Sequence, residues 1–368
     1  SNMGEWAFSP FNTISSTHGE TRNAYDLDRV PAGSSGGTAS AIAANFGVIG
    51  MGSDTGNSIR GPASHLALVG IRSTIGATSR DGIVPLLSNR DVGGPLMRTV
   101  RDSARVFNVI AGIDPADPAT EIYRNHNVDD YTANLSRNGL SGARLGVLRQ
   151  IYDANTADKM VLAVFDQALT DLELAGAVIV DPVTIPDFEE LVKATGFCGR
   201  FQYDINNYLK TLGEDTRVKS LKDVVDQEKF RPENSGAMKW AMSVAAEVKP
   251  DEQDPPCIDV AGDPRRQALL NAVVATMDSL KLDALVYPSW SNPPRKIGDS
   301  ESPHGNNSPV IAPHSGQPAI TVPMGYADND LPLGLQLLGR PFSEAKLFQF
   351  AYAYEQATRH RKPPPLFP

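Results

Sequence analysis

A stretch rich in glycine, serine and small apolar residues, residues 31–60, constrains this chain more than any other part of it. It contains two glycine turns that carry serine, GSSGG at 33–37 and GNS at 56–58. Glycine allows tight turns and lets a ligand approach the main chain closely. Successive N–H groups in such turns can converge on an anion or an oxyanion. Serine hydroxyls beside these donors indicate acyl-transfer chemistry rather than a flexible linker.

The residues of this stretch alone leave three other interpretations open. One is a plain turn between a loop and a helix. Another is a dinucleotide-binding turn at 50–56, but its spacing is GxGxxxG rather than GxGxxG, and the second half of that fold is not evident. The third takes 33–37 as GxSxG, an esterase nucleophile elbow with Ser35 as nucleophile. An elbow follows a buried strand, whereas residues 26–31 are largely polar and end in proline, which disfavours this interpretation.

Further motifs follow in a fixed order along the chain. They are GSDTGNSIRGPA at 52–63, STIGATSRDGIVPLL at 73–87, RDVGGPL at 90–96, DALVYPSW at 283–290, SGQPAITVPMGY at 315–326 and LPLGLQLLGRPFSEAKLFQFAYAYEQAT at 331–358. Together with GSSGG, they resemble the amidase signature family of serine amidohydrolases. The resemblance spans nearly the whole chain and is weakest from about residue 123 to 262. Within that region YDINNY at 203–208, with Leu209, is loosely similar to peptide-amidase-like members.

The resemblance implies a triad of a lysine, a serine in cis-peptide linkage and a nucleophilic serine. Ser58 matches the nucleophile, and Ser34 matches the bridging serine, which the cis bond would join to Gly33. A serine hydroxyl is a poor nucleophile unless a base takes its proton. A desolvated lysine can be that base because burial disfavours its charged form, and the bridging hydroxyl can accept and donate at once. The family's oxyanion hole matches the backbone N–H groups of Thr55, Gly56, Asn57 and Ser58.

Other residues are expected to support these turns. Asn57 stands where the family commonly has glycine, and asparagine tolerates a positive φ better than other non-glycine residues. Its side chain is expected to narrow the pocket. Asp54 and Arg60 flank the turn and are expected to brace it as an ion pair, and Gly33 and Ser35 are assigned a supporting role.

The base is the main departure from the family pattern. The first lysine of the sequence is Lys159, whereas the family's catalytic lysine lies upstream of GSSGG. The loop histidine His18 is a weaker candidate base. We therefore expect residues 1–368 to form a single amidase-signature domain that lacks its N-terminal segment, with the lysine on that segment or on a companion chain. The chain as given should then be catalytically incomplete.

Apolar strands alternate with amphipathic helices, which predicts an α/β fold with a mostly parallel or mixed sheet. The resemblance implies the amidase-signature fold, a large mixed β-sheet flanked by helices on both faces. Helices are predicted at 38–46, 99–110, 157–175, 265–280 and 344–358, and residues 188–248 are expected to be mainly helical. Strands are predicted at 46–51, 144–148, 177–180, 284–287, 319–322 and 333–338. Loops are predicted at 84–87, 94–96 and 289–314.

Charge and cysteine content narrow the classes of partner. The net charge of −9 argues against a nucleic-acid or acidic-membrane partner, and no apolar run approaches the ~20 residues that span a bilayer. Cys198 and Cys257 lack metal-ligand spacing and are expected to be free thiols in a reducing compartment, which favours a cytoplasmic location. No histidine pair has metal spacing, so neither a metal nor a cofactor is expected.

These observations predict an amidohydrolase that cleaves the C–N bond of a small-molecule amide through an acyl-enzyme on Ser58. Trp6 and Phe8 lie near the family's substrate-contacting segment and are expected either to line the acyl pocket or to be ordinary core aromatics. A homodimer is compatible with the sequence. Two alternatives remain: a non-catalytic relative that binds amides, and a serine esterase that uses Ser35.

Overall fold

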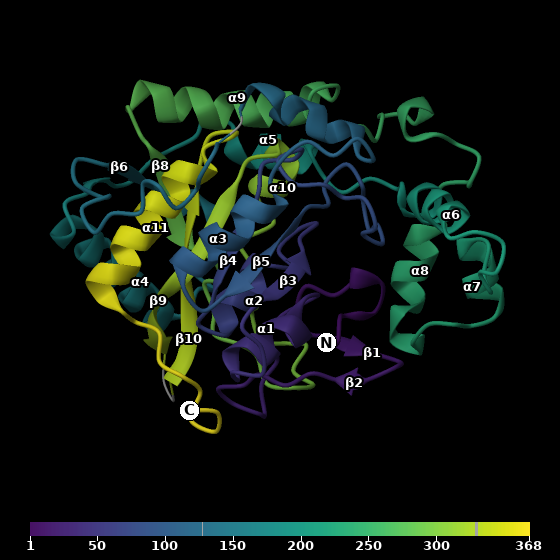
Figure 1. Cartoon of the computed structure of the whole chain (residues 1–368), viewed down its shortest axis with the longest axis horizontal. Helices are drawn as coiled ribbons and strands as arrows, with labels where there is room; N and C mark the ends of the chain where they lie inside the picture. Colours follow the sequence, from purple (N-terminus) through teal and green to yellow (C-terminus); the bar gives the residue numbers. More distant parts are fainter. Residues whose placement is uncertain (127, 328–329) are drawn as a thin grey trace.

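An eight-stranded sheet forms the centre of the structure, a computed structural model that describes residues 1–126, 128–327 and 330–368 (Figure 1). Its strand order is β3-β5-β4-β9-β10-β8-β6-β7. The strands are β3 (Gly50–Ser53), β4 (Val69–Arg72), β5 (Gly93–Met97), β6 (Arg144–Val147), β7 (Val178–Val180), β8 (Ala284–Pro288), β9 (Ala319–Ala327) and β10 (Leu331–Leu338). A separate small sheet pairs β1 (Ile14–Ser15) with β2 (Gly19–Glu20).

The large sheet is mixed, as predicted. Strand β6 runs parallel to both β7 and β8, while the other neighbouring strands described in this sheet pair antiparallel. The longest pairing joins β9 to β10, from Ala319 opposite Leu338 to Ala327 opposite Leu331. Every residue of β10 is buried, which explains why this strand is a nearly continuous apolar run in the sequence.

Helices cover both faces of this sheet, which confirms the predicted fold class (Figure 1). One face carries α3 (Val100–Ile110), α4 (Lys159–Leu174) and α11 (Glu344–Thr358). The other face carries α1 (Gly36–Ala43), α2 (Arg60–His65), α5 (Phe188–Ala194), α9 (Pro264–Ser279) and α10 (Ala312–Ser315). Successive strand side chains point to opposite faces, so Ile320 enters the first core and Ala319 the second.

Three further helices, α6 (Phe201–Thr211), α7 (Leu221–Asp226) and α8 (Ser235–Ala241), lie beside the sheet (Figure 1). They enclose a small apolar core of their own, which includes the buried residues Phe201 and Met238. Trp6 and Phe8 pack against this core, and the rings of Phe8 and Phe201 are 5.1 Å apart. The start of the chain and the helical segment at 201–241 therefore support each other.

Predictions near the glycine-rich stretch are partly wrong. The buried strand expected at 46–51 begins only at Gly50, and Phe46 and Val48 are 75% and 72% exposed. The loop expected at 94–96 lies in the fully buried strand β5. Gly-Gly-Pro has the composition of a turn, but a Cβ on Gly94 would lie 2.4 Å from the carbonyl oxygen of Ile71. Close packing between strands, which the local sequence does not show, requires glycine there.

The prediction of two free thiols is also wrong. Cys198 and Cys257 form a disulfide, with Cα atoms 5.7 Å apart and a sequence separation of 59. Tertiary structure brings the segment after α5 against the proline-rich segment before α9, and Asn89 lies beside both sulphur atoms. The separation of the two cysteines in the sequence does not predict that they pair. The inference of a reducing, cytoplasmic compartment therefore loses its basis.

Candidate active site

The two serine-bearing glycine turns lie against each other. The amide of Ser35 donates to the carbonyl oxygen of Ser58 at 3.3 Å. The Gly33–Ser34 peptide bond is cis. A Cβ on Gly33 would lie 2.2 Å from the carbonyl oxygen of Asn12, so only glycine fits at this close approach. The first turn is thereby held between the N-terminal segment and the turn that carries Ser58.

Ser34 is completely buried in this arrangement. Its carbonyl oxygen accepts hydrogen bonds from the amide of Gly4 at 2.9 Å and from the hydroxyl of Thr13 at 3.3 Å. Its own hydroxyl has no hydrogen-bond partner among the described residues, so the expected bond between Ser34 and Ser58 is not formed. Buried polar groups nearly always have a partner. The buried Ser34 hydroxyl is therefore expected to bind a hydrogen-bonding group from outside the described residues.

Ser58 lies in the turn between β3 and α2 and lines a cavity of about 420 Å³. Thr55, Gly56 and Asn57 line the same cavity. Within the part of the chain that the structure describes, the amide N–H groups of residues 55–58 donate no hydrogen bond to the protein. A hydroxyl beside several unengaged N–H donors is an arrangement that can stabilise an oxyanion.

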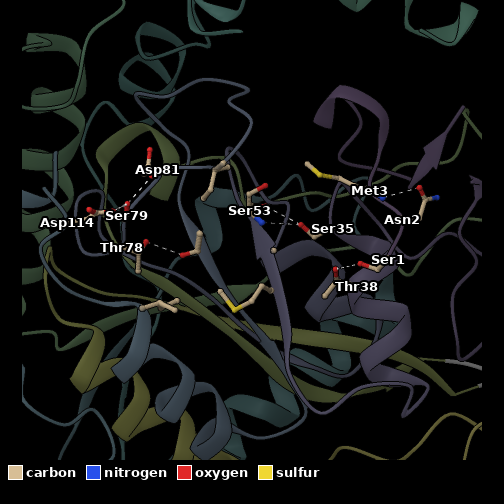
Figure 2. Close-up of a pocket in the computed structure, with 15 residues that line it drawn as sticks. Ser1, Asn2, Met3, Ser35, Thr38, Ser53, Thr78, Ser79, Asp81 and Asp114 are labelled. Atoms are coloured by element: carbon tan, nitrogen blue, oxygen red, sulfur yellow. Dashed lines mark hydrogen bonds between the residues drawn. The ribbon is translucent and has the colours of Figure 1, made fainter. Parts of the chain in front are cut away.

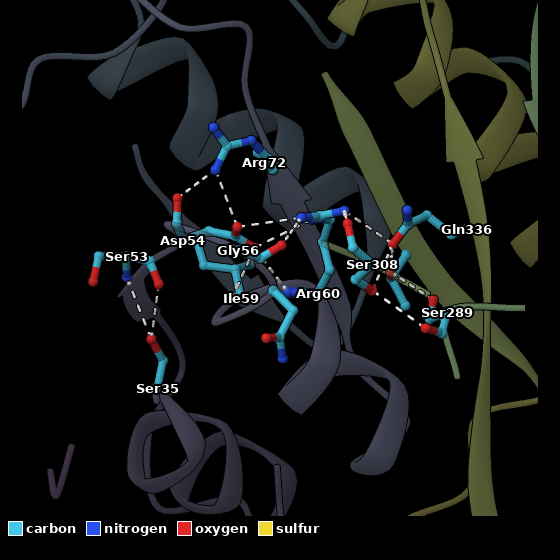
Figure 3. A network of polar contacts seen from close by, with 12 residues as sticks. Ser35, Ser53, Asp54, Gly56, Ile59, Arg60, Arg72, Ser289, Ser308 and Gln336 are labelled. Atoms are coloured by element: carbon cyan, nitrogen blue, oxygen red, sulfur yellow. Dashed lines mark hydrogen bonds and ion pairs between the residues drawn. The ribbon is translucent and has the colours of Figure 1, made fainter. Parts of the chain in front are cut away.

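A buried ionic network holds this turn (Figure 3). Asp54 lies 3.2 Å from Nε of Arg60 and 3.1 Å from Nη1 of Arg72, and all three side chains are fully buried. Asp54 also accepts from the amide of Ile59 at 3.2 Å. Burial by itself raises the pKa of Asp54, but the two guanidinium groups outweigh it and hold the pKa below its usual range. The expected pair of Asp54 with Arg60 thus includes a second cation, Arg72, that the sequence did not single out.

Arg60 joins the turn to more distant parts of the chain. Its guanidinium donates to the carbonyl oxygen of Gly56 at 2.6 Å and to that of Ser308 at 2.7 Å. It also donates to Oε1 of Gln336, on β10, at 3.2 Å. One buried arginine therefore connects the turn, the long loop at 289–314 and the central sheet.

Asn57 has a contact that the sequence did not predict. Gly56 and Asn57 are not among the described residues that have a positive φ. The ability of asparagine to adopt a positive φ is therefore not used at position 57. Asn57 is only 2% exposed, and its Nδ2 donates to the carbonyl oxygen of Gly33 at 3.2 Å. The side chain therefore links the turn of Ser58 to the Gly33–Ser34 peptide, and Asn57 also lines the cavity.

Asp91 supports the wall of the cavity. It accepts a hydrogen bond from the Thr55 hydroxyl and bonds from the amides of Leu86 at 2.9 Å and Leu87 at 3.0 Å. Burial raises the pKa of Asp91 to about 6, although these hydrogen bonds lower it. The sequence reasoning assigned no role to Asp91, and the only signal for it was its place in the motif RDVGGPL.

Ser35 faces a different cavity, of about 600 Å³, beside β3 (Figure 2). Its hydroxyl lies 3.3 Å from both the amide nitrogen and the carbonyl oxygen of Ser53. The backbone of β3 therefore engages this hydroxyl. Among the described residues that line this cavity, none is a histidine or a lysine. The described lining of the Ser58 cavity also has neither residue type, so the two serines differ in another respect: the Ser35 hydroxyl is already engaged by the backbone of β3.

The two N-terminal aromatics are placed differently from each other. Phe8 lines the cavity at Ser58, together with Phe197 and Trp240. Trp6 is not among the described lining residues and packs edge-on against Phe201, with ring centroids 6.3 Å apart. Phe8 therefore borders both the cavity and the small helical core, whereas Trp6 belongs to the core.

Two other kinds of site find no support in the described residues. In this part of the chain, no three His, Cys, Asp or Glu side chains lie close enough together to hold a metal ion. None of the helices described is both long and apolar enough to cross a bilayer.

Several known proteins are similar to this chain in sequence and in fold. The family model described as Amidase matches residues 1–348. A probable amidase of Arabidopsis thaliana is 30% identical over 375 residues, which cover 98% of this chain and 68% of that protein. One subunit of the glutamyl-tRNA(Gln) amidotransferase of Acinetobacter baylyi is 32% identical over 97% of this chain and 72% of its own length. The structure of peptide amidase from Stenotrophomonas maltophilia, at 34% identity, matches with a TM-score of 0.84 over 99% of this chain and 74% of its own.

The mixed sheet with helices on both faces is thus the fold of the amidase signature enzymes. The chain belongs to the Amidase family.

Proposed function

We propose that the protein hydrolyses the C–N bond of a small-molecule amide through an acyl-enzyme on Ser58. One observation carries the proposal: residues 55–58 line one cavity, and in this turn the Ser58 hydroxyl accompanies amide N–H groups that have no hydrogen-bond partner among the described residues. Two relatives, the peptide amidase and the amidotransferase, are named for reactions at amide groups, which supports the bond type.

The turn can perform the bond-breaking steps as follows. Oγ of Ser58 attacks the carbonyl carbon of the amide and releases its proton toward Oγ of Ser34. The carbonyl oxygen becomes an oxyanion, which the N–H groups of residues 55–58 stabilise. The C–N bond breaks as the leaving amine takes the proton, and water then releases the acid from Ser58 by the reverse proton path.

The base at the end of this proton path is assigned to a lysine, as the resemblance to the family implies. Residues 1–158 contain none, so we place this lysine on a segment preceding residue 1 or on a companion chain. The fully buried Ser34 hydroxyl, without a partner among the described residues, supports the assignment because an amine would satisfy it.

Substitution of the serines tests the nucleophile. In the full-length protein, Ser58→Ala should lower kcat for a primary amide by at least about 10³-fold with little loss of stability, because it removes the attacking hydroxyl alone. Ser35→Ala is the matched control and should lower kcat less than about tenfold. Mass spectrometry of the quenched reaction should find the acyl group on the peptide that contains Ser58.

Two outcomes would replace this proposal. Loss of activity in Ser35→Ala, with Ser58→Ala near normal, would favour the esterase elbow. A wild-type protein that binds amides tightly and hydrolyses none of them would favour the non-catalytic relative.

A further inference from the structure

The cavity at Ser58 has both polar and apolar lining residues. The polar ones are Thr55, Asn57, Ser58 and Asn306. The apolar lining comes from segments far apart in the sequence, among them Phe8, Leu86, Leu87, Phe197, Ala237 and Trp240. None of the lining residues that the structure describes is Asp, Glu, Lys, Arg or His.

Two charged side chains, Asp91 and Arg90, contact residues of these walls and are engaged by the protein. Asp91 lies behind the wall and accepts hydrogen bonds from Thr55, Leu86 and Leu87. The guanidinium of Arg90 lies 4.9 Å from the ring centroid of Phe197. Both groups therefore support the walls, and neither is among the described residues that line the cavity.

Both terminal nitrogens of Arg90 contact the chain, whereas its buried Nε has no partner among the described residues. Its Nη2 donates to the carbonyl oxygens of Thr195 at 3.0 Å and Gly196 at 2.9 Å, and its Nη1 contacts Nδ1 of His314. These bonds hold the backbone directly before Phe197. The Cys198–Cys257 disulfide anchors the residue directly after it. The Phe197 wall is thus supported on both sides along the chain.

The lining residues on α8 are supported as well. Trp240 and Ala237 lie on α8, whose Met238 and Ala241 are buried in the small helical core. Phe8 packs against Phe201 of the same core. The apolar lining of the cavity is therefore part of a packed substructure rather than a chance hollow in a loop.

We infer that this cavity selects amides whose acyl group is uncharged and apolar, such as an alkyl chain or a phenyl-bearing group. The inference rests on the proposed function at Ser58. A charged acyl group would lose its hydration in the cavity without gaining a counter-ion. Each methylene of a neutral group that enters the cavity should raise kcat/KM about fourfold, until the cavity is filled.

Three primary amides of equal chain length test the selection on the full-length wild-type protein. They are hexanamide, the cationic 6-aminohexanamide and the anionic monoamide of adipic acid. Hexanamide should have a kcat/KM at least about 30-fold above both charged amides. Equal values, or a preference for either charged amide, would overturn the inference.

A pair of variants on α8 tests whether the lining residues of the cavity determine the selectivity between neutral and charged amides. Ala237→Asp places a carboxylate in the cavity, so it should lower kcat/KM for hexanamide at least tenfold and raise it for 6-aminohexanamide by a similar factor. Gly236→Asp is the matched control, because a Cβ on Gly236 meets no atom within 4 Å and the residue is not part of the lining. It should change neither value more than twofold. If both variants shift selectivity equally, long-range charge rather than the cavity is responsible, and the inference fails.

A binding measurement separates this inference from the proposed function. Calorimetric titration of wild type with 3-phenylpropanamide and with the three hexanamide-type ligands does not depend on turnover. If no amide is hydrolysed but the neutral ligands bind at least about 30-fold more tightly, the proposed function fails and the selectivity stands. If hydrolysis requires Ser58 and the charged amides are preferred, the proposed function stands and the selectivity fails.

Discussion

Replacement of Asp54 by asparagine should destabilise the protein strongly, because Asp54 is the carboxylate between two buried guanidinium groups. The substitution keeps the shape of the side chain and removes its charge. Arg60 and Arg72, both fully buried, then share no anion within their network. Each keeps a backbone partner, since Arg60 donates to the carbonyl oxygen of Gly56 and Arg72 to that of Arg90, each at 2.6 Å.

The expected loss is about 3–5 kcal/mol of unfolding free energy, the range measured when one partner of a buried ion pair is removed. With an unfolding entropy of ~2.1 cal mol⁻¹ K⁻¹ per residue, 368 residues give about 0.8 kcal mol⁻¹ K⁻¹. The Tm should therefore fall by about 4–6 °C. Because Asp54 accepts from the amide of Ile59, directly after Ser58, kcat should fall as well.

The assay is urea denaturation followed by circular dichroism, with a scanning calorimetry run for Tm. Asp226→Asn is the matched control, because its pair with Lys222, 2.6 Å long, is exposed and should cost less than about 1 kcal/mol. If Asp54→Asn loses no more stability than this control, the Asp54 network is not desolvated as the structure indicates, and its proposed role in bracing the turn is refuted.

Two further predictions concern contacts that the structure revealed. Asn57→Ala removes the hydrogen bond from Nδ2 to Gly33, worth about 1–2 kcal/mol, so kcat should fall about 5- to 30-fold with KM nearly unchanged; an unchanged kcat would exclude a positioning role. The pKa of Asp91, raised to about 6 by burial, lies above its ordinary value near 4, so its contribution to stability is complete below pH 4 and is lost as the pH rises to 6. Relative to Asp91→Asn, the wild-type unfolding free energy should fall by about 2 kcal/mol over that interval, and parallel pH profiles of the two proteins would contradict this assignment.

Local patterns in the sequence were sufficient for several elements. The helix predicted at 344–358 is α11, and the strand predicted at 284–287 is β8 with one more residue. Periodicity and turn residues are properties of neighbouring positions, so they can be read without knowledge of the fold. The same holds for the glycine turns, whose serines and N–H groups lie close together in sequence. The mixed sheet and the family could thus be predicted from the sequence.

Tertiary structure alone decided which distant residues support those turns. Strand β5 has the composition of a loop, and only its pairing with β3 and β4 makes Gly94 part of a buried strand. Cys198 meets Cys257, and Arg72 joins Asp54, through packing between separate elements. The two serines of one glycine turn also diverge, since Ser34 is enclosed beside the turn of Ser58 while Ser35 faces another cavity. These contacts depend on the path of the chain in space. Local propensity reflects only neighbouring positions, so it cannot predict contacts between residues that are far apart in the sequence.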